Sequence, residues 1–183
     1  MHLSFFNFER NLDKLFLYEK KPKIAVGVSG GPDSIALTHL LFNWIIKKNG
    51  DLIALIIDHK IRKESLLESL KTKNYLSSKG IKSKILFVSK KKVGKGKLSQ
   101  ARTNRFEKLL NYCKKENFFH LFLGHHFDDN LETFILRKIA GSNFEGLNSM
   151  QFLSVFNNIQ VIRPLLIYKK SDILLYNSKQ KLN

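Results

Sequence analysis

The chain has 183 residues, of which 43% are hydrophobic and 26% are charged, which is the composition of an ordinary globular protein. This length suits one domain with a full core and excludes two large ones. The single cysteine, Cys113, excludes an internal disulfide framework and a Cys-x-x-Cys metal site. No stretch reaches the roughly 18 apolar residues of a membrane span, and no secretory signal is visible. We therefore expect a cytoplasmic protein with no membrane partner.

The chain is strongly basic. Its net charge is +17 and its pI is about 10.0. Such an excess suits a polyanionic partner such as nucleic acid. Most of the basic residues are lysines, and a coding bias toward lysine, asparagine and isoleucine produces the same excess without any partner. Composition alone leaves both explanations open.

Helical and strand patterns alternate along the chain. A short amphipathic helix is predicted within residues 1–22 and ends at Pro22. Strands are predicted at residues 24–28, 52–57, 81–88, 118–123 and 160–163. Further helices are predicted at 33–48, 63–79 and 98–116, with one that ends near Ile139 and a last one from Ser171.

This alternation, with no hairpin signal, predicts an α/β fold: a Rossmann-like parallel sheet of about five strands with helices on both faces. Ligands of such sheets bind beyond the carboxyl ends of the strands. Three polar clusters follow directly after predicted strands: residues 29–34, Asp58 with His59, and residues 125–132. Their common placement predicts one shared site.

The loop after the first strand has the features of a phosphate-binding turn. Gly30 and Gly31 lack a Cβ, so their backbone can approach a ligand closely, and the helix that follows adds its positive end. Ser29 and Ser34 offer hydroxyls, whereas Asp33 would repel phosphates unless Mg²⁺ lay between them. The lysine of a Walker loop is absent. The alternative is a plain turn in which Ser29 or Asp33 caps the helix, but a cap requires neither two glycines nor two serines.

A second cluster carries carboxylates at helical spacing. Asp129 and Glu132 share a helical face and suit either Mg²⁺ or a cationic substrate amine, and His125 precedes them at the predicted helix start. A transition-metal site is an alternative. Capping is another, since carboxylates in a first helical turn favour the helix dipole; we accept that role for Asp128 and not for Asp129 or Glu132.

Two arginines stand three residues apart on a predicted helix. Arg102 and Arg105 therefore share a face suited to forked contacts with phosphate, although each also fits as a surface arginine. After the second strand, His59 and Arg62 fit either the wall of a nucleotide pocket or an ordinary loop end.

Together these segments resemble the N-terminal catalytic domain of the tRNA(Ile)-lysidine synthases, a family within the PP-loop ATP pyrophosphatase superfamily. The resemblance covers about residues 20–170 and rests on motifs at residues 29–34, 57–62, 101–106, 125–133 and 163–166. The 101–106 motif is the one more particular to lysidine synthases. Iron–sulfur tRNA thiolases of the superfamily need several cysteines, which Cys113 alone cannot supply.

The resemblance implies an adenine nucleotide alpha-hydrolase-like fold and a two-step ligation. ATP adenylates the C2 oxygen of the wobble cytidine of a CAU-anticodon isoleucine tRNA and pyrophosphate leaves. The amine of free L-lysine then expels AMP, which forms lysidine. The implied ATP-binding residues are Ser29, Gly30, Gly31, Pro32, Asp33, Ser34, Asp58 and His59, with Mg²⁺ held by Asp33. The implied catalytic residues are Asp33, Arg102, Arg105, His125, Asp129 and Glu132.

Two features depart from the family pattern. Segment 140–147 keeps Gly141 and Ser142 but lacks the arginine that usually precedes them. The tRNA-binding domains that follow in the family have no counterpart after Leu166, so we expect a single PP-loop ATPase domain over residues 1–183. A silent or partner-dependent nucleotide- or tRNA-binding remnant is the alternative, and an adenylating enzyme of amidotransferase type is a third. The sequence leaves a homodimer open.

Overall fold

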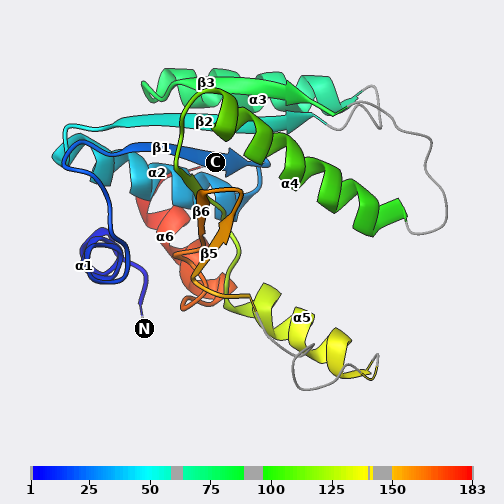
Figure 1. The fold of residues 1–183 in the computed structure, drawn as a ribbon. Coiled ribbons are helices and arrows are strands. Elements are labelled where there is room, and N and C mark those ends of the chain that lie inside the picture. The colour runs from blue at the N-terminus through cyan, green and yellow to red at the C-terminus, as the bar shows by residue number, and fades with distance from the viewer. Residues whose placement is uncertain (1, 59–63, 89–96, 140, 142–149, 183) are drawn as a thin grey trace.

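The computed structural model describes residues 2–58, 64–88, 97–139, 141 and 150–182 (Figure 1). Within these ranges six strands form one sheet in the order β3-β2-β1-β4-β6-β5. The strands are β1 (Lys23–Val28), β2 (Asp51–Asp58), β3 (Ser83–Phe87), β4 (His120–Phe122), β5 (Leu153–Phe156) and β6 (Ile159–Ile162). The helices are α1 (Phe5–Leu15), α2 (Pro32–Lys47), α3 (Glu64–Ser78), α4 (Lys97–Lys115), α5 (Phe127–Ile139) and α6 (Lys170–Gln180).

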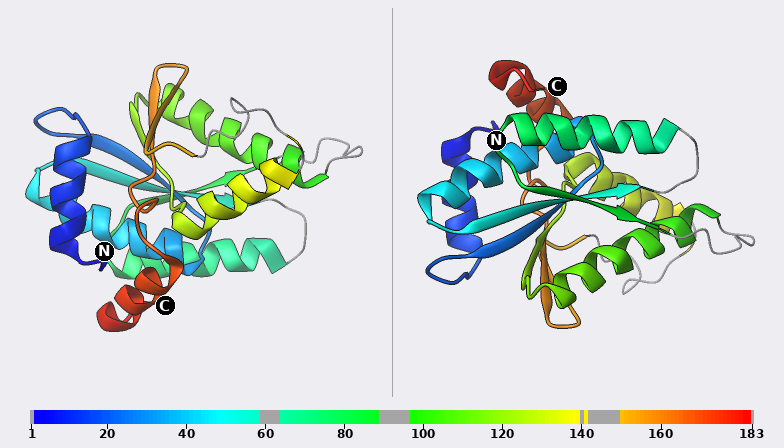
Figure 2. Two further views of the ribbon diagram at one scale, coloured as in Figure 1. Left: turned by 90° about the horizontal axis from the view of Figure 1, so that it is seen from below. Right: turned by 90° about the horizontal axis from the view of Figure 1, so that it is seen from above.

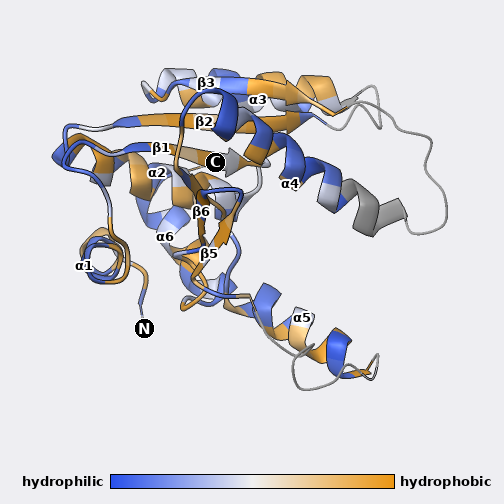
Figure 3. Ribbon diagram, in the orientation of Figure 1, coloured by the Kyte–Doolittle hydropathy of each residue, from blue (hydrophilic) through white to orange (hydrophobic). Residues whose placement is uncertain are grey.

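Helices cover both faces of the sheet (Figure 2). Buried side chains of α1, α2, α3 and α6 form the core on one face, and those of α4 form the core on the other. Ile24 and Val26 of β1 join the first core and Ala25 joins the second, because successive strand residues point to opposite faces. β2 is apolar along most of its length (Figure 3), as a strand buried on both faces requires. The predicted α/β fold is confirmed.

The sheet has one strand more than predicted, and that strand is antiparallel. β1 runs parallel to β2 and β4, and β6 runs parallel to β4, but β5 pairs antiparallel with β6. The two strands are joined by Asn157 and Asn158, whose φ angles are 49° and 64°. Asparagine tolerates the positive φ that a two-residue hairpin turn needs at both positions. The sheet is therefore parallel as predicted except for the hairpin of β5 and β6, which was not predicted.

The ends of the chain differ slightly from the predicted elements. α1 occupies only Phe5–Leu15 of the predicted 1–22 segment, and the Ser4 hydroxyl caps it by accepting from the Asn7 N–H at 3.2 Å.

α5 has no buried residue and extends away from the sheet (Figure 1). Of the helices in the described ranges, none is long and apolar enough to span a membrane.

The starts of β1 and β2 meet at a glycine without room for a side chain. The Asp51 N–H donates to the Pro22 carbonyl at 2.9 Å. A Cβ at Gly50 would collide with that same carbonyl oxygen and would lie 2.7 Å from Cδ1 of Ile45. Glycine at position 50 therefore allows the turn from α2 to run close beside the start of β1.

We expect Gly50→Ala to lower the free energy of unfolding by about 3 kcal/mol, because backbone must move to relieve the collision. Gly80→Ala is the matched control: its φ of 74° imposes strain, but the nearest atom to a new Cβ is 3.9 Å away. The control should lose only about 1 kcal/mol. Urea unfolding measures both variants, and equal losses would contradict the explanation.

Candidate nucleotide-binding site

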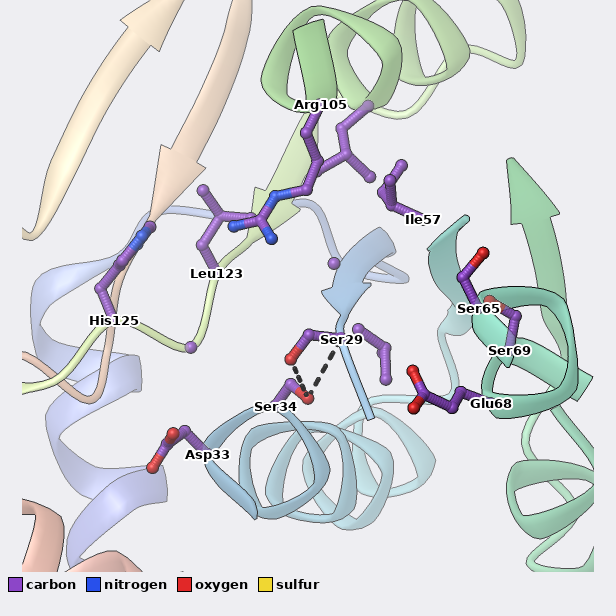
Figure 4. Close-up of a pocket in the computed structure, with 14 residues that line it drawn as sticks. Ser29, Asp33, Ser34, Ile57, Ser65, Glu68, Ser69, Arg105, Leu123 and His125 are labelled. Carbon is purple, nitrogen blue, oxygen red and sulfur yellow. Dashed lines mark hydrogen bonds between the residues drawn. The ribbon is translucent and has the colours of Figure 1, made fainter. Parts of the chain in front are cut away.

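A cavity of about 270 Å³ opens at the carboxyl ends of β1 and β2 and beside the segment that follows β4 (Figure 4). The loop after β1, the start of α2, and one face each of α3 and α4 contribute to its wall. The lining side chains and backbone belong to Gly27, Val28, Ser29, Asp33, Ser34, Ile57, Ser65, Glu68, Ser69, Arg105, Leu109, Leu123, Gly124 and His125. The structure thus brings the 29–34 loop and the 125–132 segment to one place.

The loop after β1 is held by hydrogen bonds between its own residues. The Ser29 N–H donates to the Ser34 hydroxyl at 3.2 Å, and the Ser34 hydroxyl donates to the Gly31 carbonyl at 2.9 Å. Gly30 has a φ of 83°, and a Cβ there would lie 2.7 Å from the Thr72 hydroxyl of α3. Glycine is therefore required at position 30 on two counts. Gly31 has a φ of −77° and is the N-cap of α2.

Two carboxylates flank the paired serines of the loop. Asp33, the second residue of α2, lies on one side of Ser29 and Ser34, and Glu68 of α3 lies on the other (Figure 4). Pro32 is the first residue of α2, a position that needs no backbone N–H. The Lys170 ammonium is 2.6 Å from Oδ1 of Asp33. Negative charge thus stands at both sides of a loop whose geometry favours anions.

Only one of the two candidate arginines lines the cavity. Arg105 reaches over Leu123 into the cavity, whereas Arg102 is exposed and does not line it (Figure 4). Burial lowers the pKa of Arg105, and the charge of Arg102 lowers it further. A partly desolvated guanidinium interacts more strongly with an anion than a solvated one does.

The two neighbouring histidines face different ways. His125 lines the cavity, and its buried Nδ1 has no hydrogen-bond partner within the described part of the chain. Burial, helped by the Arg163 charge, lowers the pKa of His125 to about 4, so the ring is neutral at pH 7. His126 is buried among carboxylates, with its Nε2 3.8 Å from Oδ1 of Asp33.

Neither Asp129 nor Glu132 lines the cavity. The Asp129 carboxylate accepts from the His126 N–H at 2.9 Å, which caps the start of α5. Capping was expected for Asp128 and not for Asp129, but this bond shows that Asp129 caps the helix, because the first N–H groups of a helix need acceptors. Its role toward a substrate stays a prediction. Glu132 is exposed one turn later on α5. Asp128 accepts from the Lys170 N–H at 2.7 Å.

Asp58 does not line the cavity but holds a residue that does. Asp58 is 1% exposed, and its carboxylate accepts from the Ser65 hydroxyl at 2.7 Å; Ser65 of α3 lines the cavity. His59 and Arg62, the other candidates after this strand, lie outside the described residues.

The contribution of α3 to the cavity was not predicted from the sequence. Ser65, Glu68 and Ser69 line the cavity, and the Thr72 hydroxyl takes the space that a Cβ at Gly30 would need. These four polar residues recur at spacings of three and four, which places them on one helical face. That spacing could have indicated a cavity-lining face, but a polar helical face more often faces solvent.

The described side chains do not form a metal cluster of their own, but Asp33 could serve as one ligand of a nucleotide-bound cation. Within the described ranges, no three His, Cys, Asp or Glu side chains gather as a metal site, so the transition-metal alternative finds no support there. Asp33 offers carboxylate oxygens at the edge of the cavity. Mg²⁺ commonly binds one or two carboxylates together with substrate phosphates, and Asp33 fits that requirement.

Comparison with known proteins identifies the family. Residues 5–183 match the PP-loop domain, and the chain belongs to this family. It is 37% identical over 180 residues to a tRNA(Ile)-lysidine synthase of Orientia tsutsugamushi (strain Boryong), an alignment that covers 96% of this chain and 40% of that one. It is 40% identical over 171 residues to a tRNA(Ile)-lysidine synthase of Wolbachia sp. subsp. Brugia malayi (strain TRS), with coverage of 92% and 39%. The chain therefore spans about 40% of the length of these curated relatives.

A solved structure shares the fold. The U34-tRNA thiolase NcsA from Methanococcus maripaludis, determined with its [4Fe-4S] cluster, superposes with a TM-score of 0.81 and 22% identity. The match covers 98% of this chain and 65% of that one. The likeness supports the adenine nucleotide alpha-hydrolase-like fold.

The lowered pKa of His125 predicts a pH dependence of stability. The unfolded chain takes up this proton near pH 6.5 and the folded chain only near pH 4. Stability is therefore full above about pH 6.5 and falls as the pH drops toward 4, by at most about 3 kcal/mol from this group. Urea unfolding at pH 7 and pH 5 should show a smaller pH effect in His125→Gln than in the wild type. An unchanged pH effect in the variant would contradict the prediction.

Proposed function

We propose that this chain ligates L-lysine to C2 of the wobble cytidine of CAU-anticodon tRNA(Ile), with ATP converted to AMP and pyrophosphate, as its relatives' name implies. The observation that carries the proposal is the cavity in which the 29–34 loop, Arg105 and His125 face one another. An anion-binding loop, a cation and a neutral hydrogen-bonding group are the set that an adenylation step needs.

In the first step, the cavity binds ATP with its phosphates at the loop. The wall formed by Ile57, Leu109 and Leu123 offers an apolar surface for the adenine ring. The C2 oxygen of cytidine attacks the α-phosphorus, the bond from that phosphorus to the bridging oxygen breaks, and pyrophosphate leaves. Arg105 stabilises the charge that develops on the phosphoryl oxygens. Asp33 would hold Mg²⁺, which when bound neutralises phosphate charge.

In the second step, the lysine amine attacks C2 and AMP departs with the former C2 oxygen. The Asp129 carboxylate lies 3.6 Å from Nε2 of His126, next to the cavity residue His125, and would attract the cationic amino acid together with Glu132 of the same helix. His125 has a pKa of about 4 and is therefore a weak base at pH 7. We propose that it forms part of the wall beside the substrate as a neutral group and adds no charge there.

The tRNA substrate accords with the net charge of +17. A second candidate is an ATP-binding domain that completes the ligation only with a partner. It is favoured by the position of Asp129 and Glu132 outside the cavity lining. The two candidates share ATP binding and differ in lysine transfer.

Lysine incorporation tests the proposal. The purified chain is incubated with ATP, Mg²⁺, labelled lysine and unmodified CAU-anticodon tRNA(Ile), and the product is followed by mass spectrometry. We expect incorporation, and a loss of about 10²-fold in Arg105→Ala, which removes a charge at the reacting phosphate.

Arg102→Ala is the matched control, because it removes the same charge three residues away and outside the cavity. Its activity should stay within a few-fold of the wild type. Equal losses in the two variants would contradict the role of Arg105. ATP binding without incorporation would favour the partner-dependent candidate.

A further inference from the structure

Lys170 contacts the phosphate loop from a distant part of the chain. Its ammonium lies 2.6 Å from Oδ1 and 2.5 Å from Oδ2 of Asp33, across 137 residues of sequence. Asp33 lines the cavity, and Lys170 is the first residue of α6. A cation from the last helix thus stands at the edge of the candidate nucleotide site.

The position of Lys170 is fixed by its surroundings. Its own N–H donates to Asp128 at 2.7 Å, and the carbonyl of the buried Tyr168 accepts from the Phe127 N–H at 2.9 Å. Further along α6, the Asn177 side chain donates to the Pro32 carbonyl at 2.9 Å. The first two bonds tie the start of α6 to the start of α5, and the third ties a later turn of α6 to the start of α2. The ion pair therefore lies where α2, α5 and α6 are bonded to one another. The Lys170 side chain is 37% exposed and the Asp33 side chain is 22% exposed.

A cation near residues 29–34 would reduce the repulsion between Asp33 and bound phosphates. Residues 29–34 include no lysine, and Asp33 places a negative charge where phosphates would bind. An ammonium has three N–H donors, and the two oxygens of Asp33 engage two of them. One donor remains for an oxygen of a ligand.

We propose that Lys170 is a phosphate-binding residue of the nucleotide site. It neutralises Asp33 and also donates directly to the phosphate chain of bound nucleotide, so that α6 supplies the positive charge that the loop sequence lacks. This inference rests on the proposed function for the identity of the ligand, ATP. The competing explanation is that the pair only fastens α6 to α2.

Calorimetric titration with ATP and with inorganic pyrophosphate, in EDTA and in excess Mg²⁺, tests the proposal. In EDTA we expect Lys170→Gln to bind both ligands about tenfold more weakly than the wild type, because a charge-assisted hydrogen bond is lost. Lys170→Arg keeps the charge and should stay within about threefold. Lys169→Gln is the matched control, since it removes the same charge from the preceding exposed residue, and should bind like the wild type.

The decisive comparison removes Asp33 as well. In Asp33→Asn the repulsive carboxylate is gone, and metal-free affinity should equal or exceed that of the wild type. If Lys170 contacts phosphate, adding Lys170→Gln to Asp33→Asn weakens binding again by about tenfold. Equal affinity of the double variant and Asp33→Asn would show that Lys170 only neutralises Asp33, and would overturn the proposal.

Thermal melting of each variant separates binding from folding. A lowered melting temperature in Lys170→Gln with unchanged metal-free affinity for ATP and pyrophosphate would also overturn the proposal, because the pair would then serve only to fasten α6. Absence of ATP binding by the wild-type chain would contradict the proposed function, and this inference with it.

Discussion

The turn at Gly30 is the constraint on which the rest of the site depends. With a φ of 83°, it carries the chain from the centre of the sheet into α2 within a few residues. Its missing side chain leaves room for Thr72, so α3 packs directly against the loop. The same turn sets Asp33 at the edge of the cavity, where α6 attaches through Lys170. Residues of two helices distant in sequence thus meet at this one short loop.

The site is assembled around a balance of charge. The loop and the start of α2 favour an anion, and Arg105 faces them from α4 (Figure 4). Asp33 and Glu68 stand on either side of the loop and oppose an anion unless cations accompany it. Lys170 meets that need at Asp33. His125 is kept neutral by burial, so it adds hydrogen bonding without adding charge.

The sheet was predictable because its central strands are buried on both faces and therefore read as continuous apolar runs. The loop was predictable because glycines and serines after such a run are specific. The turn at Asn157 and Asn158 was not predicted, because its flanking strands are only four residues each and β5 is half exposed. Arg102 and Arg105 are equivalent by spacing, and only packing separates them. Lys170 had no local signal, since its partner lies 137 residues away.

The most direct test of this account is a co-crystal structure of the chain with a non-hydrolysable ATP analogue and Mg²⁺. We expect the phosphates to lie against residues 29–34, with Arg105 and Lys170 in contact with phosphate oxygens. The adenine ring should lie against Ile57, Leu109 and Leu123. An analogue bound elsewhere on the chain, or phosphates turned away from the loop, would contradict it.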